Sequence, residues 1–233
     1  MKSWKTKSGN RILQVLSGRS NVFLLTNGAK NILIDTGPKF MGKTLEKRLT
    51  RLNVHQIDYL ILTHSHFDHA GNARSIKEKF NARVIIHKDE ASYLASGDFL
   101  IPQGTNFVTR TLVNLLSKHV AHKFKCEPCS NDLLTETKNN FKDDGFNAYI
   151  MHTPGHSSGS VSVIVDDEIA LVGDAMFGVF KWSVFPPFAQ EPDQMIQSWG
   201  RLLETKCSVF LPSHGTANSR QLVQKDYDKR IKK

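Results

Sequence analysis

The sequence predicts an α+β protein in which two β-sheets pack together and helices cover their outer faces. Three observations support this class. The apolar runs have the length of single strands, amphipathic segments separate them, and both halves repeat a rhythm of several strands, a helix, a strand and a polar turn. With 233 residues, 39% hydrophobic and 23% charged, the chain is typical of a globular protein, which we expect to form a single domain over residues 1–233.

Strands and helices alternate in the first part of the chain. Two apolar runs flank Asn27-Gly28, a dipeptide typical of a tight hairpin turn. Leu45, Leu49 and Leu52 recur at helical spacing, with lysines and arginines between them. In chain order, the predicted elements are strands 22–26 and 31–35, helix 40–52, strand 57–62, helix 70–80 and strand 82–87.

The pattern changes between about residues 92 and 141, where glycine and proline interrupt it. One apolar stretch, 107–120, keeps a helical character. We therefore expect a helical and loop insertion within the single domain. Its helix either covers a site as a lid or packs only for stability.

The strand pattern resumes after the expected insertion. An amphipathic helix is predicted over 191–203, where Met195, Trp199 and Leu202 lie on one face. The other predicted elements are strands 146–152, 160–165, 169–172 and 207–211, followed by a basic, helix-prone tail.

The net charge of +9 is concentrated at the two ends of the chain. Residues 1–34 hold six Lys or Arg and no acid, and residues 225–233 hold five against two acids. Basic ends of this kind favour a solvated surface over a nucleic-acid contact. No apolar run approaches the ~18 residues of a membrane span, and the N-terminus lacks the apolar core of a signal peptide. We expect a cytoplasmic protein without a membrane partner.

The three cysteines, Cys126, Cys129 and Cys207, are too few and odd in number for a disulfide framework. Cys126 and Cys129 form a CxxC pair, with His119 and His122 just upstream. A small zinc site or a redox pair is conceivable there, but the spacing is tighter than that of usual zinc sites. Reduced thiols are the favoured interpretation.

Seven side chains provide the ligands for two metal ions held side by side. Four of them lie within six residues, His64, His66, Asp68 and His69, on the loop after a predicted buried strand. His64 and His66 can approach one metal together, while Asp68 and His69 point to a neighbouring position. The other three follow strand-like runs downstream and are His156, Asp174 and His214. Imidazole and carboxylate groups suit divalent transition metals, so the set predicts a metal site at one edge of the sheets.

These residues make the chain resemble the metallo-β-lactamase superfamily over nearly its whole length. The matching motifs are Ile34-Asp35-Thr36-Gly37, the cluster 64–69, Thr153-Pro154-Gly155-His156, Gly173-Asp174 and Ser213-His214-Gly215. The resemblance implies the four-layer αββα sandwich of that superfamily. It also implies an enzyme, a metal-dependent hydrolase.

The resemblance further implies a role for each matched residue. His64, His66 and His156 would bind the first metal ion. Asp68, His69 and His214 would bind the second, and Asp174 would bridge the two. Asp35 would be a supporting acid behind the ligands rather than a ligand itself. We expect two divalent ions, with zinc favoured and iron or manganese compatible with the same ligands.

The expected reaction is attack of a metal-bound hydroxide on the carbonyl of an ester, thioester or lactone. Asp68 would be the catalytic residue that orients the water and moves its proton. The substrate is expected to be a small molecule with an apolar portion, because aromatic residues are dense over 177–188 and apolar residues over 107–116. The sequence predicts neither the substrate-binding residues nor the oligomeric state.

The presence of both Asp68 and His69 resembles the glyoxalase II and lactonase branch. Only 19 residues follow His214, fewer than the glutathione-binding domain of glyoxalase II needs. Phe177 stands where the similar quorum-sensing lactonases carry a tyrosine. Two other activities remain as alternatives. One is a persulfide dioxygenase with a single iron on residues matching His64, His156 and Asp174, and the other is a metal-dependent nuclease or phosphodiesterase.

Overall fold

Two β-sheets form the centre of the protein in a computed structural model that describes residues 1–99, 101, 103–120, 125–136 and 138–232. The first sheet has the order β1 (Ser3–Lys5), β2 (Arg11–Leu16), β3 (Val22–Thr26), β4 (Asn31–Ile34), β5 (Tyr59–Ile61), β6 (Arg83–Ile86) and β7 (Leu133–Leu134). The second has the order β12 (Asn218–Ser219), β11 (Val209–Pro212), β10 (Ile169–Gly173), β9 (Val161–Val165) and β8 (Ala148–His152).

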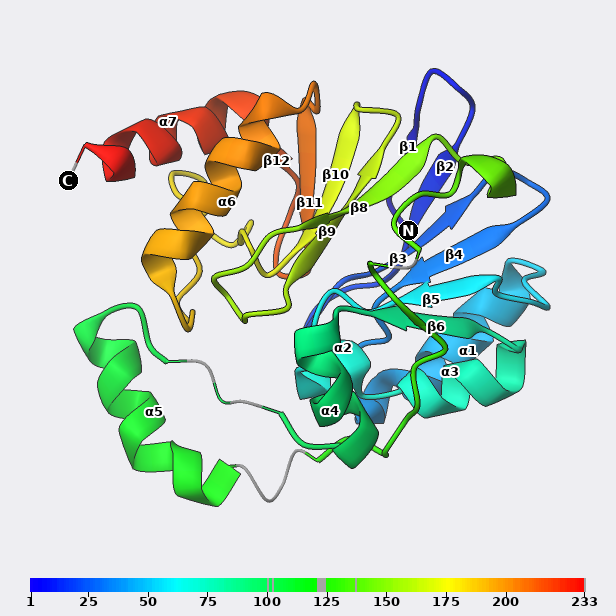
Figure 1. Cartoon of the computed structure of the whole chain (residues 1–233), viewed down its shortest axis with the longest axis horizontal. Coiled ribbons are helices and arrows are strands. Elements are labelled where there is room, and N and C mark those ends of the chain that lie inside the picture. Colours follow the sequence, from blue (N-terminus) through cyan, green and yellow to red (C-terminus); the bar gives the residue numbers. More distant parts are fainter. Residues whose placement is uncertain (100, 102, 121–124, 137, 233) are drawn as a thin grey trace.

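Helices cover the outer face of each sheet, so the layers follow the order αββα (Figure 1). On the first sheet lie α1 (Gly42–Arg51), α2 (Phe67–Ala70), α3 (Ala73–Phe80) and α4 (Lys88–Ser96), with the short 3-10 helix η1 (Lys39–Met41) before α1. On the second lie α6 (Pro192–Glu204) and α7 (Arg220–Ile231). The helix α5 (Phe107–Val120) stands outside both helical layers, and η2 (Lys142–Asp144) precedes β8. The predicted α+β sandwich is confirmed.

Three apolar clusters hold the four layers together. The central strands, such as β3, β5, β9 and β10, are buried on both faces, so alternate residues face different clusters. In β3, Phe23 and Leu25 face the second sheet, whereas Leu24 belongs to the cluster that contains Leu45 and Leu49 of α1. The third cluster joins the second sheet to α6 and α7. Burial on both faces explains why these strands read as continuous apolar runs.

The predicted strands and helices are present, with ends that differ by a few residues. The sequence reasoning did not predict β1 and β2, whose polar residues interrupt the apolar pattern, nor the short strands β7 and β12. It also missed α4, which runs through the expected start of the insertion at residue 92. Part of the expected insertion returns to the first sheet as β7, which pairs in parallel with β6.

The three cysteines form no disulfide and are buried. The alternative zinc site at the CxxC pair includes His122, which lies outside the described residues. Within the described part of the chain, no helix is both long enough and apolar enough to cross a membrane.

Candidate metal centre

The seven predicted ligands meet at one edge of the sandwich because the strands that carry them end there. β4 and β5 run parallel in the first sheet, and β10 and β11 run parallel in the second. Parallel neighbours end at the same edge, which brings their following loops together. The backbone then joins the two sheets, since the Val161 N–H donates to Thr63 O at 2.9 Å and the Asn21 N–H donates to Ser213 O at 2.6 Å.

Local backbone geometry sets the directions of the first four ligands. His66 has extended dihedral angles and stands at the N-terminal boundary of the single-turn helix α2, so Asp68 and His69 leave the backbone on successive positions of a helical turn. Thr36 then holds this turn in place, since its N–H and its hydroxyl each donate to His69 O at 2.7 Å.

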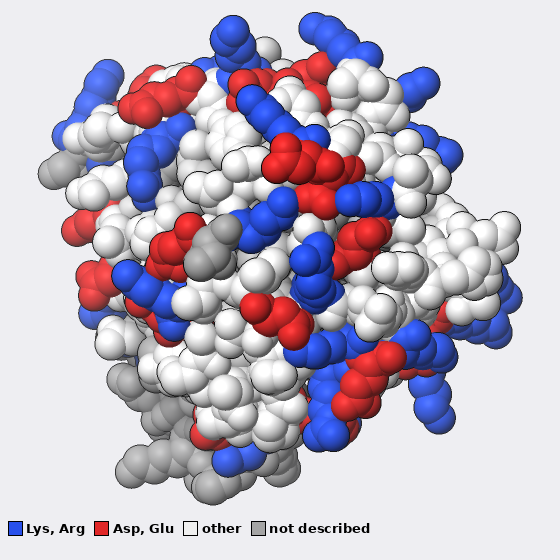
Figure 2. Space-filling view, turned by 45° about the vertical axis from the view of Figure 1, so that its right-hand side comes forward, with Lys and Arg blue, Asp and Glu red and all other residues white. Residues whose placement is uncertain are grey.

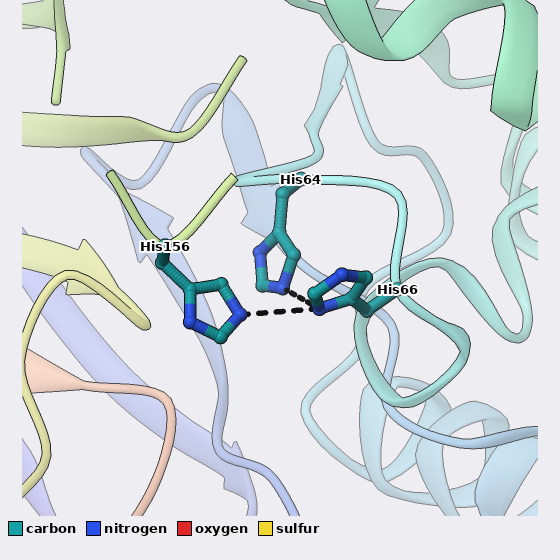
Figure 3. Close-up of side chains that lie close together, drawn as sticks. All are labelled: His64, His66 and His156. Carbon is teal, nitrogen blue, oxygen red and sulfur yellow. Dashed lines mark hydrogen bonds between the residues drawn. The ribbon is translucent and has the colours of Figure 1, made fainter. Parts of the chain in front are cut away.

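Three histidines form the first group (Figure 3), and two ring nitrogens point at the same atom of the third. His64 Nε2 lies 2.9 Å and His156 Nε2 lies 3.1 Å from His66 Nδ1. The other nitrogen of His156 donates to Phe188 O at 3.0 Å, because a carbonyl oxygen only accepts, so His156 Nε2 carries a lone pair.

The tautomer of His64 follows in the same way. Its Nδ1 lies 3.1 Å from the Thr63 hydroxyl, which itself donates to Asp35. His64 therefore donates through Nδ1, and its Nε2 also carries a lone pair. His66 Nδ1 faces two lone pairs and can supply at most one proton. A cation between the three rings would satisfy all three nitrogens.

Asp68, His69 and His214 form the second group, and Asp174 lies between the two groups. The His214 Nε2 lies 3.3 Å from Asp68 Oδ2 and 3.3 Å from Asp174 Oδ2. Asp174 Oδ2 also lies 3.5 Å from His156 Nε2 of the first group. Within each group of three, the potential ligand atoms all lie within 4.8 Å of one another, and Asp174 completes a further such group with His64 and His69.

The two groups have opposite electrostatic character. In the first, burial lowers the pKa of His64 well below its usual value, lowers that of His156, and lowers that of His66 to about 4. These rings are therefore neutral near pH 7, which is the form that binds metals.

In the second group the carboxylates dominate. Burial lowers the pKa of His214, but Asp174 and Asp68 outweigh it and raise that pKa to about 10. The same two carboxylates hold the pKa of His69 well above its usual value despite burial. His69 and His214 are therefore protonated near pH 7 in the metal-free protein. A bound cation would replace their positive charge beside the two carboxylates.

Among the described residues, three buried side-chain atoms lack a hydrogen-bond partner, one of them His66 Nε2, and the other two show that the residues fit a bound cation. His69 Nε2 and Asp174 Oδ1 are buried without a hydrogen-bond partner, and they face each other at 3.6 Å. This separation is too long for a hydrogen bond, and buried polar atoms are normally satisfied. Nitrogen and carboxylate oxygen donors in this arrangement suit divalent zinc, iron or manganese.

Asp35 lies behind the second group, fully buried. Its carboxylate accepts hydrogen bonds from the Thr63 N–H at 2.8 Å, from His69 Nδ1 at 2.8 Å and from the Ser213 hydroxyl at 3.2 Å. The bond to Nδ1 directs His69 Nε2 toward Asp68 and Asp174. Asp35 thus contacts His69 on the ring nitrogen opposite the one that faces Asp68 and Asp174, and its role as a supporting acid stays a prediction.

Sequence reasoning missed Glu90, a buried acid of α4 that joins the loops of the first group. Its carboxylate accepts hydrogen bonds from the N–H and hydroxyl of Ser65 and from the Gly159 N–H. Burial raises the pKa of Glu90, but hydrogen bonds from Ser157 and Ser65 and the nearby His66 outweigh it, and the pKa is lowered. An acid in the first turn of a helix is common, so no signal in the sequence set Glu90 apart.

Comparison with known proteins agrees with this geometry. Residues 17–214 match the family model of the metallo-β-lactamase superfamily. A probable metallo-hydrolase of Methanocaldococcus jannaschii is 33% identical over 204 residues, which are 86% of this chain and 90% of that protein. A hydroxyacylglutathione hydrolase of Haemophilus influenzae is 27% identical over 168 residues, 71% of each protein. An archaeal metallo-β-lactamase superfamily protein from Sulfolobus tokodaii has a similar solved structure, with a TM-score of 0.67 at 20% identity over 96% of this chain and 86% of that one.

Proposed function

Because this chain belongs to the metallo-β-lactamase superfamily, we propose that it is a dinuclear metal-dependent hydrolase that cleaves an ester, thioester or lactone. One observation carries the proposal. Two groups of three potential ligands lie side by side, and the carboxylate of Asp174 reaches both. Two neighbouring divalent ions at such a site acidify water and polarise the bond under attack.

The ligand assignment follows from the two groups. His64, His66 and His156 would hold the first ion. Asp68, His69 and His214 would hold the second, and Asp174 could contribute to both positions. Zinc is the expected ion, since imidazole and carboxylate ligands suit it, and iron or manganese would fit the same set.

Substrate reaches the site from the side of the second group. The side chains of Asp68 and His214 are 19% and 17% exposed, whereas those of His69, His156 and Asp174 are at most 5% exposed. Asp68 is therefore the carboxylate best placed to exchange a proton between the site and solvent.

The charge state of Asp68 suits that role. Burial raises the pKa of Asp68, but the nearby His69 and His214 have a larger, opposite effect. The pKa is therefore lowered, and the carboxylate is ionised near pH 7. Its Oδ2 faces His214 Nε2 at 3.3 Å. In this state Asp68 can orient a water molecule by hydrogen bonding and accept a proton from it.

Aromatic side chains beside His214 support a substrate with an apolar portion. The ring of Phe177 packs at 4.6 Å, centroid to centroid, from that of His214. Phe180 and Trp182 follow closely in the chain, and both are exposed. Their rings pack against each other with centroids 5.4 Å apart and planes tilted by 32°. Gly178, two residues before Phe180, donates its N–H to His214 O at 2.7 Å, so the exposed pair follows a segment that contacts the site and is a suitable contact for an acyl chain.

A thioester is the first substrate to test, because one relative is a hydroxyacylglutathione hydrolase. A nucleic-acid substrate has less support. On the face shown in Figure 2, lysine and arginine side chains alternate with acidic ones rather than gathering in a continuous basic surface.

The test combines metal analysis with a substrate panel. Protein purified from its native host should contain two divalent ions per chain and should hydrolyse acyl thioesters, esters or lactones. Loss of activity on chelation and its return with zinc would support the proposal. A single iron per chain, with oxygen uptake on glutathione persulfide, would replace it with a dioxygenase. No turnover of any panel member by metal-loaded protein would refute it.

A further inference from the structure

We propose that Glu90 is a positioning residue that holds the two loops of the three-histidine metal position together, an inference that rests on the proposed function. Glu90 is 3% exposed and lies on α4, outside every predicted motif. Among the described residues, the hydrogen bonds to its carboxylate come from Ser65, Ser157 and Gly159. Its effect on the metal position is therefore exerted through the loops that carry the ligands.

Each oxygen of Glu90 serves a different loop. Oε2 accepts from the backbone N–H of Ser65 at 3.0 Å and from the Ser65 hydroxyl. Ser65 lies between His64 and His66. Oε1 accepts from the Gly159 N–H at 3.3 Å, three residues after His156. The first loop follows β5 of one sheet and the second joins β8 to β9 of the other, so a single carboxylate joins ligand loops from both halves.

The close approach at the second loop depends on a glycine. A Cβ atom at Gly159 would lie 2.5 Å from Glu90 Cγ and 3.1 Å from His87 Nδ1. Glycine therefore lets α4 pack directly against the loop backbone. The contact to the Gly159 N–H exists only at this short distance.

The charge of Glu90 favours a cation at the three-histidine position. Among the described residues, Glu90 forms no ion pair with a lysine or arginine, and three neutral imidazoles bring no negative charge of their own. A buried carboxylate without a cationic partner is costly. A divalent ion held by the neighbouring rings would supply the missing positive charge, and Asp174 is the carboxylate that touches this group directly.

Asp35 and Glu90 support the two positions to different extents. Asp35 contacts the His69 ring of the second group directly and reaches His64 only through the Thr63 hydroxyl, whereas Glu90 accepts hydrogen bonds from both loops of the first group. Loss of Glu90 should therefore weaken one metal position more than the other. A residue that only stabilised the fold would weaken both positions to the same extent.

The decisive variant is Glu90→Gln. An amide keeps the shape but has one acceptor oxygen, so its NH₂ must face either the Ser65 or the Gly159 N–H, and one loop contact is lost. Glu90→Asp keeps the charge and tests whether a carboxylate one methylene shorter partly restores the position. Glu46→Gln is the matched control, because Glu46 also accepts from a serine hydroxyl, that of Ser75 at 2.9 Å, and pairs with Lys79 away from the site.

The measurement is metal affinity of the full chain rather than turnover alone. Metal-free wild type and variants are titrated with Zn²⁺ against a competing chelator, and the Co²⁺-loaded forms are compared by absorption spectroscopy. We expect Glu90→Gln to lose about 10- to 100-fold in affinity at one position, with a changed Co²⁺ spectrum. Glu90→Asp should lie between it and wild type, and Glu46→Gln should match wild type.

Two outcomes overturn the inference while the proposed function stands. One is wild-type affinity at both positions in Glu90→Gln. The other is an equal loss at both positions together with a lowered melting temperature of the metal-free protein, which would identify a purely structural residue. A wild-type protein that takes up no metal would instead refute the proposed function, and the inference with it.

Discussion

Replacing Asp35 by asparagine should release the second metal ion by changing the proton position on His69. The substitution keeps the side-chain shape, and asparagine tolerates the φ of +62° at this residue. The amide oxygen can keep the Thr63 N–H contact, which places the NH₂ group against His69 Nδ1. That nitrogen must then accept a hydrogen bond, so the ring proton moves to Nε2, the atom that faces Asp68 and Asp174. A protonated Nε2 cannot bind a metal.

The size of the effect follows from the contacts of Asp35. If the His69 proton stays on Nδ1, two buried donors face each other at about the 2.8 Å of the present contact, and an unsatisfied buried donor costs about 1–3 kcal/mol. If the proton moves, the ligand is lost. Substitution of groups that orient metal ligands typically costs about 10- to 100-fold in affinity, equivalent to about 1.4–2.8 kcal/mol. Both routes predict a similar loss of metal affinity at the second position.

The assay is a zinc titration of the metal-free protein with a competing chelator, followed by elemental analysis after dialysis. Asp35→Asn should retain one ion per chain where wild type retains two. Asp58→Asn is the control, because Asp58 accepts the Asn31 N–H at 2.8 Å at the opposite end of β5. The reasoning is refuted if Asp35→Asn binds the second ion as tightly as wild type does.

Three further predictions concern the shared ligand, pH and the aromatic pair. Asp174→Ala should lose both ions on dialysis and all hydrolytic activity, because Asp174 reaches both groups; elemental analysis that still finds two ions would contradict this. In the metal-free protein the pKa of His214 is about 10 against an ordinary 6.5, since Asp174 outweighs burial. The stabilisation that protonated His214 gives the folded protein is complete below about pH 6.5 and is lost as pH rises toward 10. The melting temperature measured in chelator should therefore fall across that range, and a flat profile would argue against the raised pKa. Trp182→Ala, at a side chain 73% exposed, should change stability by less than about 0.5 kcal/mol but raise the KM for long-chain acyl substrates roughly 3- to 10-fold. An unchanged KM would separate the aromatic pair from substrate binding.

Much of the fold could be predicted because its strands are buried on both faces. Runs such as 22–25 and 59–62 are continuously apolar, and the helices between them keep one apolar stripe. β1 and β2 escaped prediction because polar residues interrupt or begin them, exposed in β1 and half-buried at Gln14 of β2. The start of α4 escaped because Lys88-Asp89-Glu90 gives no apolar periodicity at its first turn.

By itself the sequence indicated that a polar turn follows each of these strands, and hence predicted that His64, His66, Asp68, His69, His156, Asp174 and His214 share one edge of the sandwich. Spacing along the chain is local information, and parallel strands bring their carboxyl ends together whatever the details of packing. Only the tertiary structure decided that Asp174 reaches both groups, that Asp35 faces the far nitrogen of His69, and that Glu90 joins the loops of the first group. These contacts connect residues from different sheets and from an outer helix. Their geometry depends on how the layers pack against one another, which no spacing within a single segment specifies.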